Sequence, residues 1–216
     1  IDNGYDAFSL DNNRETLSDQ PGFDTQKSRL ASLQITADTF ENFSLQLITG
    51  FADSDIGYGY DEDWTYNGFH PDGYSSTDHY LRDRRTLSAE IRLLSTDAGA
   101  LLHGRTSWVA GLYLLDQQVD LERQYTYLPA DFQSSFDISR TALYADSTTQ
   151  LSQNLTMETG LRIENFLATY KDSDALYVDP NDSLAGGRIA LNYHTADKKL
   201  FYSSISRGYK IGGFNT

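Results

Sequence analysis

Apolar and polar residues alternate over long stretches of this chain, and a period of two is the pattern of β-strands whose two faces meet different surroundings. The clearest case lies between Thr141 and Lys171, where two alternating segments flank the short polar stretch Ser152–Asn154. In the second segment the apolar side chains fall on one face and the charged ones on the other. The sequence therefore predicts an antiparallel hairpin of two long strands joined by a tight turn.

The predicted strands are too long for an ordinary soluble sheet. A strand of about 16 residues spans about 50 Å, whereas strands of soluble proteins usually have about 5 or 6 residues. The same alternation recurs along the whole chain and predicts about nine strands. They are the end of a strand at 5–10 and strands at 23–38, 43–53, 80–95, 105–127, 141–151, 155–171, 184–194 and 199–209.

The connections between these strands are of two kinds that alternate along the chain. Those near residues 40, 100, 153 and 197 are short, whereas those near residues 17, 66, 131 and 178 are mostly longer. Outer-membrane barrels have this asymmetry, with short turns on one rim and longer loops on the other. We therefore predict an all-β, up-and-down antiparallel meander that is an open segment of a large transmembrane β-barrel, because closed barrels of this kind have even strand numbers.

The alternation also predicts which side chains face lipid and which face the lumen. In a membrane barrel the apolar face points outward and the polar face inward. The expected outward residues are Leu33, Ile35, Leu45, Leu47, Leu87, Ala89, Ile91, Leu112, Leu161, Ile163 and Leu191. The expected lumen residues are Ser32, Gln34, Gln46, Glu90, Arg92, Glu158 and Arg162.

Composition narrows the function classes. The chain has 17 basic and 31 acidic residues and a formal net charge of −14, which excludes a general nucleic-acid binder because such proteins need a basic surface. The mean hydropathy of −0.51 and the lack of a long apolar run argue against a helical membrane span. The chain begins at Ile1 without a signal peptide, so we expect a piece of a longer protein.

The sequence offers little for catalysis or metal binding. It has no G-x-S-x-G elbow, no cysteine and no H-E-x-x-H motif, so neither an enzyme nor a cofactor is expected. Two clusters were weighed as metal ligands: His70, Asp72 and His79, and Asp61, Glu62 and Asp63. The first fits no ligand template and the second leaves a calcium site only as an alternative, so no metal site is predicted.

The longest predicted connection, residues 54–79, is the candidate ligand-binding loop. It contains acidic and aromatic side chains and no lysine or arginine. Exposed aromatic faces suit neutral sugars, flat hydrophobic ligands or cations, and acidic surfaces repel anions. The candidate ligand-binding residues are Trp64, Tyr66, Tyr58 and Tyr60. The alternative is a mobile lid or an acidic outer surface that never touches ligand.

The C-terminal sequence resembles a known signature. Its residues Arg207, Gly208, Tyr209, Lys210, Gly212, Gly213, Phe214 and Asn215 are similar to the R-G-Y-K-x-G-G-F-N motif in the barrel of TonB-dependent outer-membrane receptors. Residues 88–115 and 141–164 resemble the same family. The glycines of the motif are also expected to bend the strand into a loop.

The resemblance implies a barrel of about 22 strands around an N-terminal plug domain, in the outer membrane of a Gram-negative bacterium. It implies uptake of a scarce nutrient, such as an iron–siderophore complex, with energy passed from TonB through the plug. Residues 1–216 are then a partial barrel domain without the plug, and its partners are membrane lipid, the plug, the TonB system and a small nutrient. The charged lumen residues form either a solvated wall or contacts with the plug.

A soluble all-β module for binding or surface adhesion is the alternative. Such a module would fold its strands into two packed sheets, each with one wet face. The receptor would need detergent to stay in solution, because its apolar face points outward, whereas the module would be soluble without it.

Overall fold

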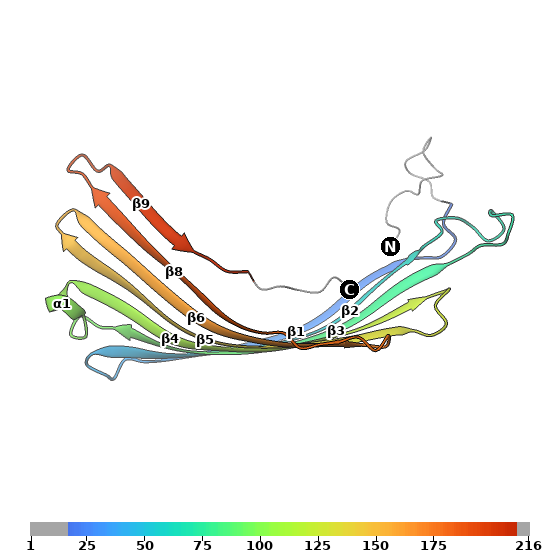
Figure 1. Cartoon of the computed structure of the whole chain (residues 1–216), viewed down its shortest axis with the longest axis horizontal. Coiled ribbons are helices and arrows are strands. Elements are labelled where there is room, and N and C mark those ends of the chain that lie inside the picture. Colours follow the sequence, from blue (N-terminus) through green and yellow to red (C-terminus); the bar gives the residue numbers. More distant parts are fainter. Residues whose placement is uncertain (1–16, 211–216) are drawn as a thin grey trace.

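The computed structural model describes residues 17–210, and these form one long, curved antiparallel sheet (Figure 1). The strands are β1 (Phe23–Ala37), β2 (Phe43–Asp61), β3 (Thr77–Ser95), β4 (Thr106–Tyr125), β5 (Phe132–Ser152), β6 (Leu155–Asp172), β7 (Tyr177–Val178), β8 (Asn181–His194) and β9 (Leu200–Arg207). A four-residue helical turn, α1 (Leu101–Gly104), lies in the connection between β3 and β4.

Each long strand pairs only with its neighbours in the sequence. The order across the sheet is β1-β2-β3-β4-β5-β6-β8-β9, and the two-residue β7 pairs with β6. β1 and β9 are the edges of the described sheet, which is not closed. The predicted meander is therefore confirmed, and the two-sheet alternative is wrong for this part of the chain. The strand end predicted at 5–10 lies outside the described residues, and β7 was not predicted.

The connections alternate between two rims, as predicted, but their lengths overlap, because 96–105 on one rim has ten residues and 126–131 on the other has six. The turns that join β1 to β2, β5 to β6 and β8 to β9 lie on the same rim as α1, on the left of Figure 1. The connections 62–76, 126–131 and 173–180 lie on the opposite rim, which we call the outer rim. No helix among residues 17–210 is long and apolar enough to cross a membrane.

The strands reach further toward the outer rim than the sequence predicts. β2 continues to Asp61 and β3 begins at Thr77, so the connection predicted at 54–79 is shorter. β5 likewise begins at Phe132, inside a predicted loop. Gly57 and Gly59 look like loop residues in the sequence, but a Cβ on Gly59 would lie 2.4 Å from the ring of Phe23. These glycines are therefore strand positions that leave room for an aromatic ring on the neighbouring strand.

The two faces of the sheet differ as predicted. Leu47 pairs with Ile91, Ile91 with Leu112, Leu112 with Leu143 and Leu143 with Ile163, so one apolar row crosses five strands on one face. We call this the lipid face, because Ile91, Leu143 and Ile163 are 44%, 62% and 55% exposed rather than packed in a core.

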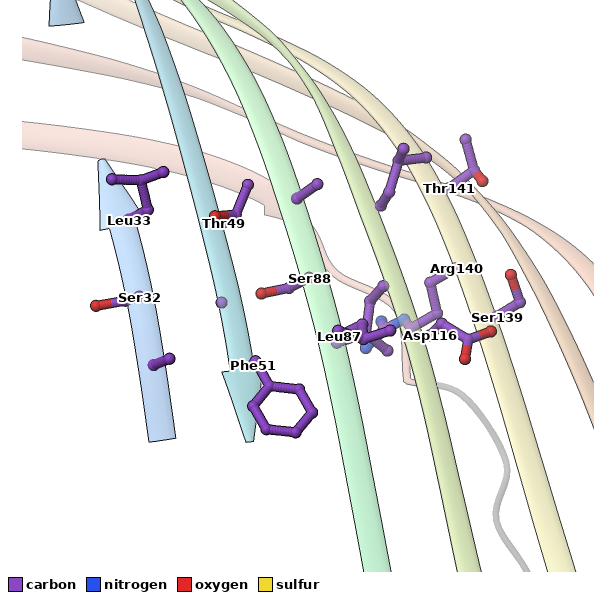
Figure 2. A pocket seen from close by; sticks show the side chains of 15 residues that line it. Ser32, Leu33, Thr49, Phe51, Leu87, Ser88, Asp116, Ser139, Arg140 and Thr141 are labelled. Carbon is purple, nitrogen blue, oxygen red and sulfur yellow. The ribbon is translucent and has the colours of Figure 1, made fainter. Parts of the chain in front are cut away.

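The opposite face is the lumen face, and it carries the polar side chains. Figure 2 shows side chains on both faces of the sheet. Ser32 and Ser88 point to one side, and Thr49 and Phe51 point to the other. The predicted lumen residues Gln34, Gln46, Glu90, Arg92, Glu158 and Arg162 have the same strand parity and register as Ser32 and Ser88. The predicted orientation is thus confirmed for the described strands.

The apolar band of the lipid face ends well before the strands do. Phe51 pairs with Leu87, and beyond this row the same face carries Asp53 opposite Arg85 and Asp55 opposite Asp83. β2 to β6 have 18 to 21 residues, whereas about 9 to 11 residues cross a bilayer. The strands therefore project beyond the membrane at the outer rim.

Candidate functional site

A buried carboxylate organises the lumen face near β6. Glu164 is 1% exposed, and Arg140 Nε donates a hydrogen bond of 2.7 Å to its Oε1. Arg162 Nη2 and the Tyr209 hydroxyl donate bonds of 2.8 and 3.0 Å to Oε2. The carboxylate is thus fully compensated, because a buried charge is stable only when it is paired and hydrogen-bonded.

A second ionic group lies beside it on β3 and β5. Arg92 Nη2 donates a bond of 2.8 Å to Glu90, and the Tyr144 hydroxyl donates one of 2.5 Å to the same carboxylate. The ring of Tyr144 lies across Gly111, where a Cβ would meet it at 2.4 Å. Side chains from both groups line a hollow of about 720 Å³ on the lumen face, namely Arg162 and Tyr209 from the first and Glu90, Arg92 and Tyr144 from the second. We call these side chains the lumen ion-pair cluster.

The described part of the C-terminal motif joins this cluster. β9 ends at Arg207, and the next residues bring the Tyr209 ring over Gly186, where a Cβ would lie 3.1 Å from that ring. Gly212, Gly213, Phe214 and Asn215 of the motif lie outside the described residues. The motif tyrosine therefore acts as a tie between the chain after β9 and Glu164 on β6.

An aromatic and charged wall covers the lumen face near the outer rim. Arg123 Nε and Nη2 donate bonds of 2.9 and 2.6 Å to Asp78. The Tyr80 and Tyr60 hydroxyls donate to the same carboxylate at 3.1 and 3.5 Å. The guanidinium carbon of Arg123 also lies 5.2 Å above the ring of Tyr80 and 5.3 Å above that of Tyr125. We call this group, with the neighbouring Tyr58, the vestibule wall.

Burial and hydrogen bonding oppose each other at Asp78. Burial raises its pKa, but the bonds from Arg123 and the two tyrosines are stronger together, so the pKa lies below its ordinary value of 3.8. Burial and the nearby Asp78 charge raise the pKa of Tyr60 to about 12. The vestibule wall therefore holds an ionised Asp78, a charged Arg123 and neutral Tyr60 and Tyr80 side chains at neutral pH.

The placement of Tyr58 and Tyr60 corrects a sequence prediction. We expected both in the outer loop, but they are strand residues of β2 with Tyr60 opposite Asp78 and Tyr58 opposite Tyr80. The sequence prediction also missed the pairing of Asp78 with Arg123. The two residues are 45 positions apart, and only the β3–β4 register brings them together.

The outer loop 62–76 is held by buried polar side chains at its base. Asp63 accepts bonds from the Thr65 hydroxyl at 2.5 Å and from the Ser76 amide at 2.9 Å. Asp61 accepts bonds from the Ser18 hydroxyl at 2.6 Å and from the Asp19 amide at 3.1 Å. Burial raises the pKa of Asp61. The loop therefore has a defined base, although its tip is exposed.

A continuous series of rings runs from the tip of this loop to the end of β4. Successive ring centroids lie 5.5, 5.3, 5.7, 5.2 and 5.9 Å apart, and the fourth pair is stacked with planes 13° apart. The rings, in order, are Tyr66, Phe69, His70, Tyr74, Tyr127 and Tyr125. We call this series the aromatic ladder.

The two ligand candidates of the loop have different positions. Tyr66 begins the ladder and is 49% exposed. Trp64 is half-buried and has a φ of 58°, in the left-handed region that non-glycine residues rarely adopt. Both remain predicted ligand contacts.

Neither sequence-based metal cluster is assembled in the described part of the chain. His70 lies within the aromatic ladder, whereas His79 on β3 packs edge-on against Phe23 at 5.1 Å. Among residues 17–210, no group of three or more His, Cys, Asp or Glu side chains is placed to hold a metal ion.

Comparison with solved structures supports the barrel architecture. The structure superimposes on the ferric citrate transporter FecA with a TM-score of 0.68 and 14% identity, over 83% of this chain and 27% of that one. The ferric-catecholate import receptor Fiu from E. coli K12 matches with a TM-score of 0.68 and 12% identity, over 90% and 37%. The copper transporter OprC matches with a TM-score of 0.65 and 13% identity, over 88% and 31%.

The chain thus spans about a third of the length of the solved receptors that it matches. No curated protein matches its sequence. The family model described as TonB dependent receptor-like, beta-barrel, matches residues 1–216. Together with the single two-faced sheet, this match shows that the chain belongs to the β-barrel family of TonB-dependent receptors, which are non-enzymatic transporters of the Gram-negative outer membrane.

Proposed function

We propose that this chain forms part of the barrel wall of a longer receptor that imports a scarce nutrient, such as an iron–siderophore complex, across the outer membrane. The observation that carries the proposal is the two-faced sheet, with lipid-exposed apolar rows on one side and an ionic lumen wall on the other. Similar solved structures are named as transporters or receptors for ferric citrate, ferric catecholates and copper.

The energy for transport would come from the TonB system through a plug domain inside the barrel. The lumen ion-pair cluster supports this proposal, because Glu90, Arg92 and Arg162 of the cluster line a hollow on the face that a plug would contact. The partners of the receptor would be outer-membrane lipid, the plug, TonB and the nutrient.

Uptake in cells tests the proposal. Deletion of the gene that encodes this chain should abolish growth on at least one iron or copper source at limiting metal, and deletion of TonB should have the same effect. Complementation should restore growth only when TonB is present. If growth on every iron and copper source tested were independent of both this gene and TonB, the proposed function would be wrong.

A further inference from the structure

The aromatic ladder joins the loop tip to the vestibule wall. It begins at Tyr66 on the loop and ends at Tyr125 on β4, whose ring lies under the guanidinium of Arg123. Tyr66, Tyr74 and Tyr127 are 49%, 36% and 53% exposed. A row of partly exposed aromatic rings can attract a cation, because the face of an aromatic ring carries partial negative charge.

The connections that carry the ladder have formal charge of one sign only, and the guanidinium over its last ring, that of Arg123, is paired with Asp78. The outer-rim connections 62–76, 126–131 and 173–180, with the segment 17–22 that bonds to the loop, contain no lysine or arginine. Their acidic residues are Asp19, Glu62, Asp63, Asp72, Asp131, Asp174 and Asp179. Surfaces of one charge concentrate ligands of the opposite charge and repel their own.

On the lumen face, positive charge first appears below the rim, on β4 and β3. Arg123 is neutralised by Asp78, whereas Arg82 and Arg84 lie further from the rim and point to the same face as Tyr80. A ligand that enters from outside therefore meets rings and carboxylates first and guanidinium groups afterwards.

From this arrangement we infer that the outer rim captures a nutrient through a positively charged organic group, such as an ammonium, that sits on the aromatic ladder. The oxygen-rich remainder of the ligand then points toward Arg82 and Arg84, whose guanidinium groups donate hydrogen bonds to oxygen. This inference rests on the proposed uptake function and specifies the charge of the imported ligand.

Three forms of one ferric complex test the charge preference. The probes are a ferric trihydroxamate with a pendant ammonium, the same complex with that amine acetylated, and the same complex with it succinylated. They keep the metal and its ligands and change the pendant group alone, whose charge goes from positive to neutral to negative. Binding to the purified receptor that carries this barrel segment should weaken in that order, and the preference should shrink as salt is added.

Variants of the stacked pair test the ladder. Replacing Tyr74 and Tyr127 together by Leu removes two rings, and the ammonium complex should bind about 5- to 30-fold more weakly. The pair Tyr74→Phe and Tyr127→Phe keeps the rings and removes the hydroxyl bonds to Glu62 and Ser75, so it should bind nearly as well as the unmodified receptor. Tyr177→Leu, at an exposed tyrosine on β7, is the matched control and should change nothing.

The outcomes separate the two proposals. Equal or tighter binding of the acetylated or succinylated complex, unchanged binding by the double Leu variant, or no binding of any of the three probes would overturn the inference. In each of these cases TonB-dependent growth on another metal source would leave the uptake function intact. The absence of any TonB-dependent growth phenotype would overturn the uptake function itself.

Discussion

Substituting Ile91 by Arg places a charge on the lipid face. Ile91 is 44% exposed and lies in the apolar row between Leu47 and Leu112. It is four residues from the end of β3 at Ser95, which corresponds to about 10 Å along the barrel axis for a strand tilted by about 40°. This depth is near the middle of an apolar band about 25 Å tall. The expected cost is therefore about 2 to 4 kcal/mol of barrel stability.

Such a cost shifts the folding equilibrium by about 30- to 900-fold toward the unfolded chain. The control is Ser88→Arg on the lumen face of the same strand, next to Gly50 and facing away from lipid. Folding of the receptor into lipid vesicles across a urea series, scored by heat-modifiable migration on gels, measures both variants. The Ile91→Arg variant should fold only at much lower urea concentrations than the unmodified receptor. The Ser88→Arg variant should fold over the same range of urea concentrations as the unmodified receptor. Equal losses for the two variants would refute the assignment of the faces.

Two further predictions concern the lumen face. Asp78→Asn should destabilise the receptor by about 1 to 3 kcal/mol at pH 7, a range that allows for the partly exposed Arg123. Because the pKa of Asp78 is lower in the folded protein, its contribution is complete above about pH 4 and is lost as the pH falls through the lowered value. Urea midpoints should thus fall on acidification more in the unmodified receptor than in Asp78→Asn, and parallel curves would contradict this. Gly186→Val should crowd both the Arg207 carbonyl oxygen and the Tyr209 ring, 2.9 and 3.1 Å from a Cβ there, and cost about 1 to 3 kcal/mol. Gly208→Ala, with open space around its Cβ, should cost little. Equal urea midpoints for the two would count against close packing of the chain after β9 on Gly186.

The sequence alone determined the fold class, the strand order and the two faces. Period-two alternation fixes which side chains share a face, because successive residues of a strand point in opposite directions. A short turn forces the two strands that it joins to pair with each other. For this reason the apolar face with Ile91 and Ile163 and the polar face with Glu90 and Arg162 were both predicted correctly.

Strand ends and site contacts depended on the tertiary structure. Gly57 and Gly59 look like loop residues in the sequence, but in the structure the Phe23 ring from β1 packs against them. The local sequence does not show which strand lies beside them. The bond between Asp78 and Arg123 and the contact of Tyr74 with Tyr127 join residues from different connections and strands. Only the register of β3 against β4 sets those distances, because a shift by one residue would turn each side chain to the other face.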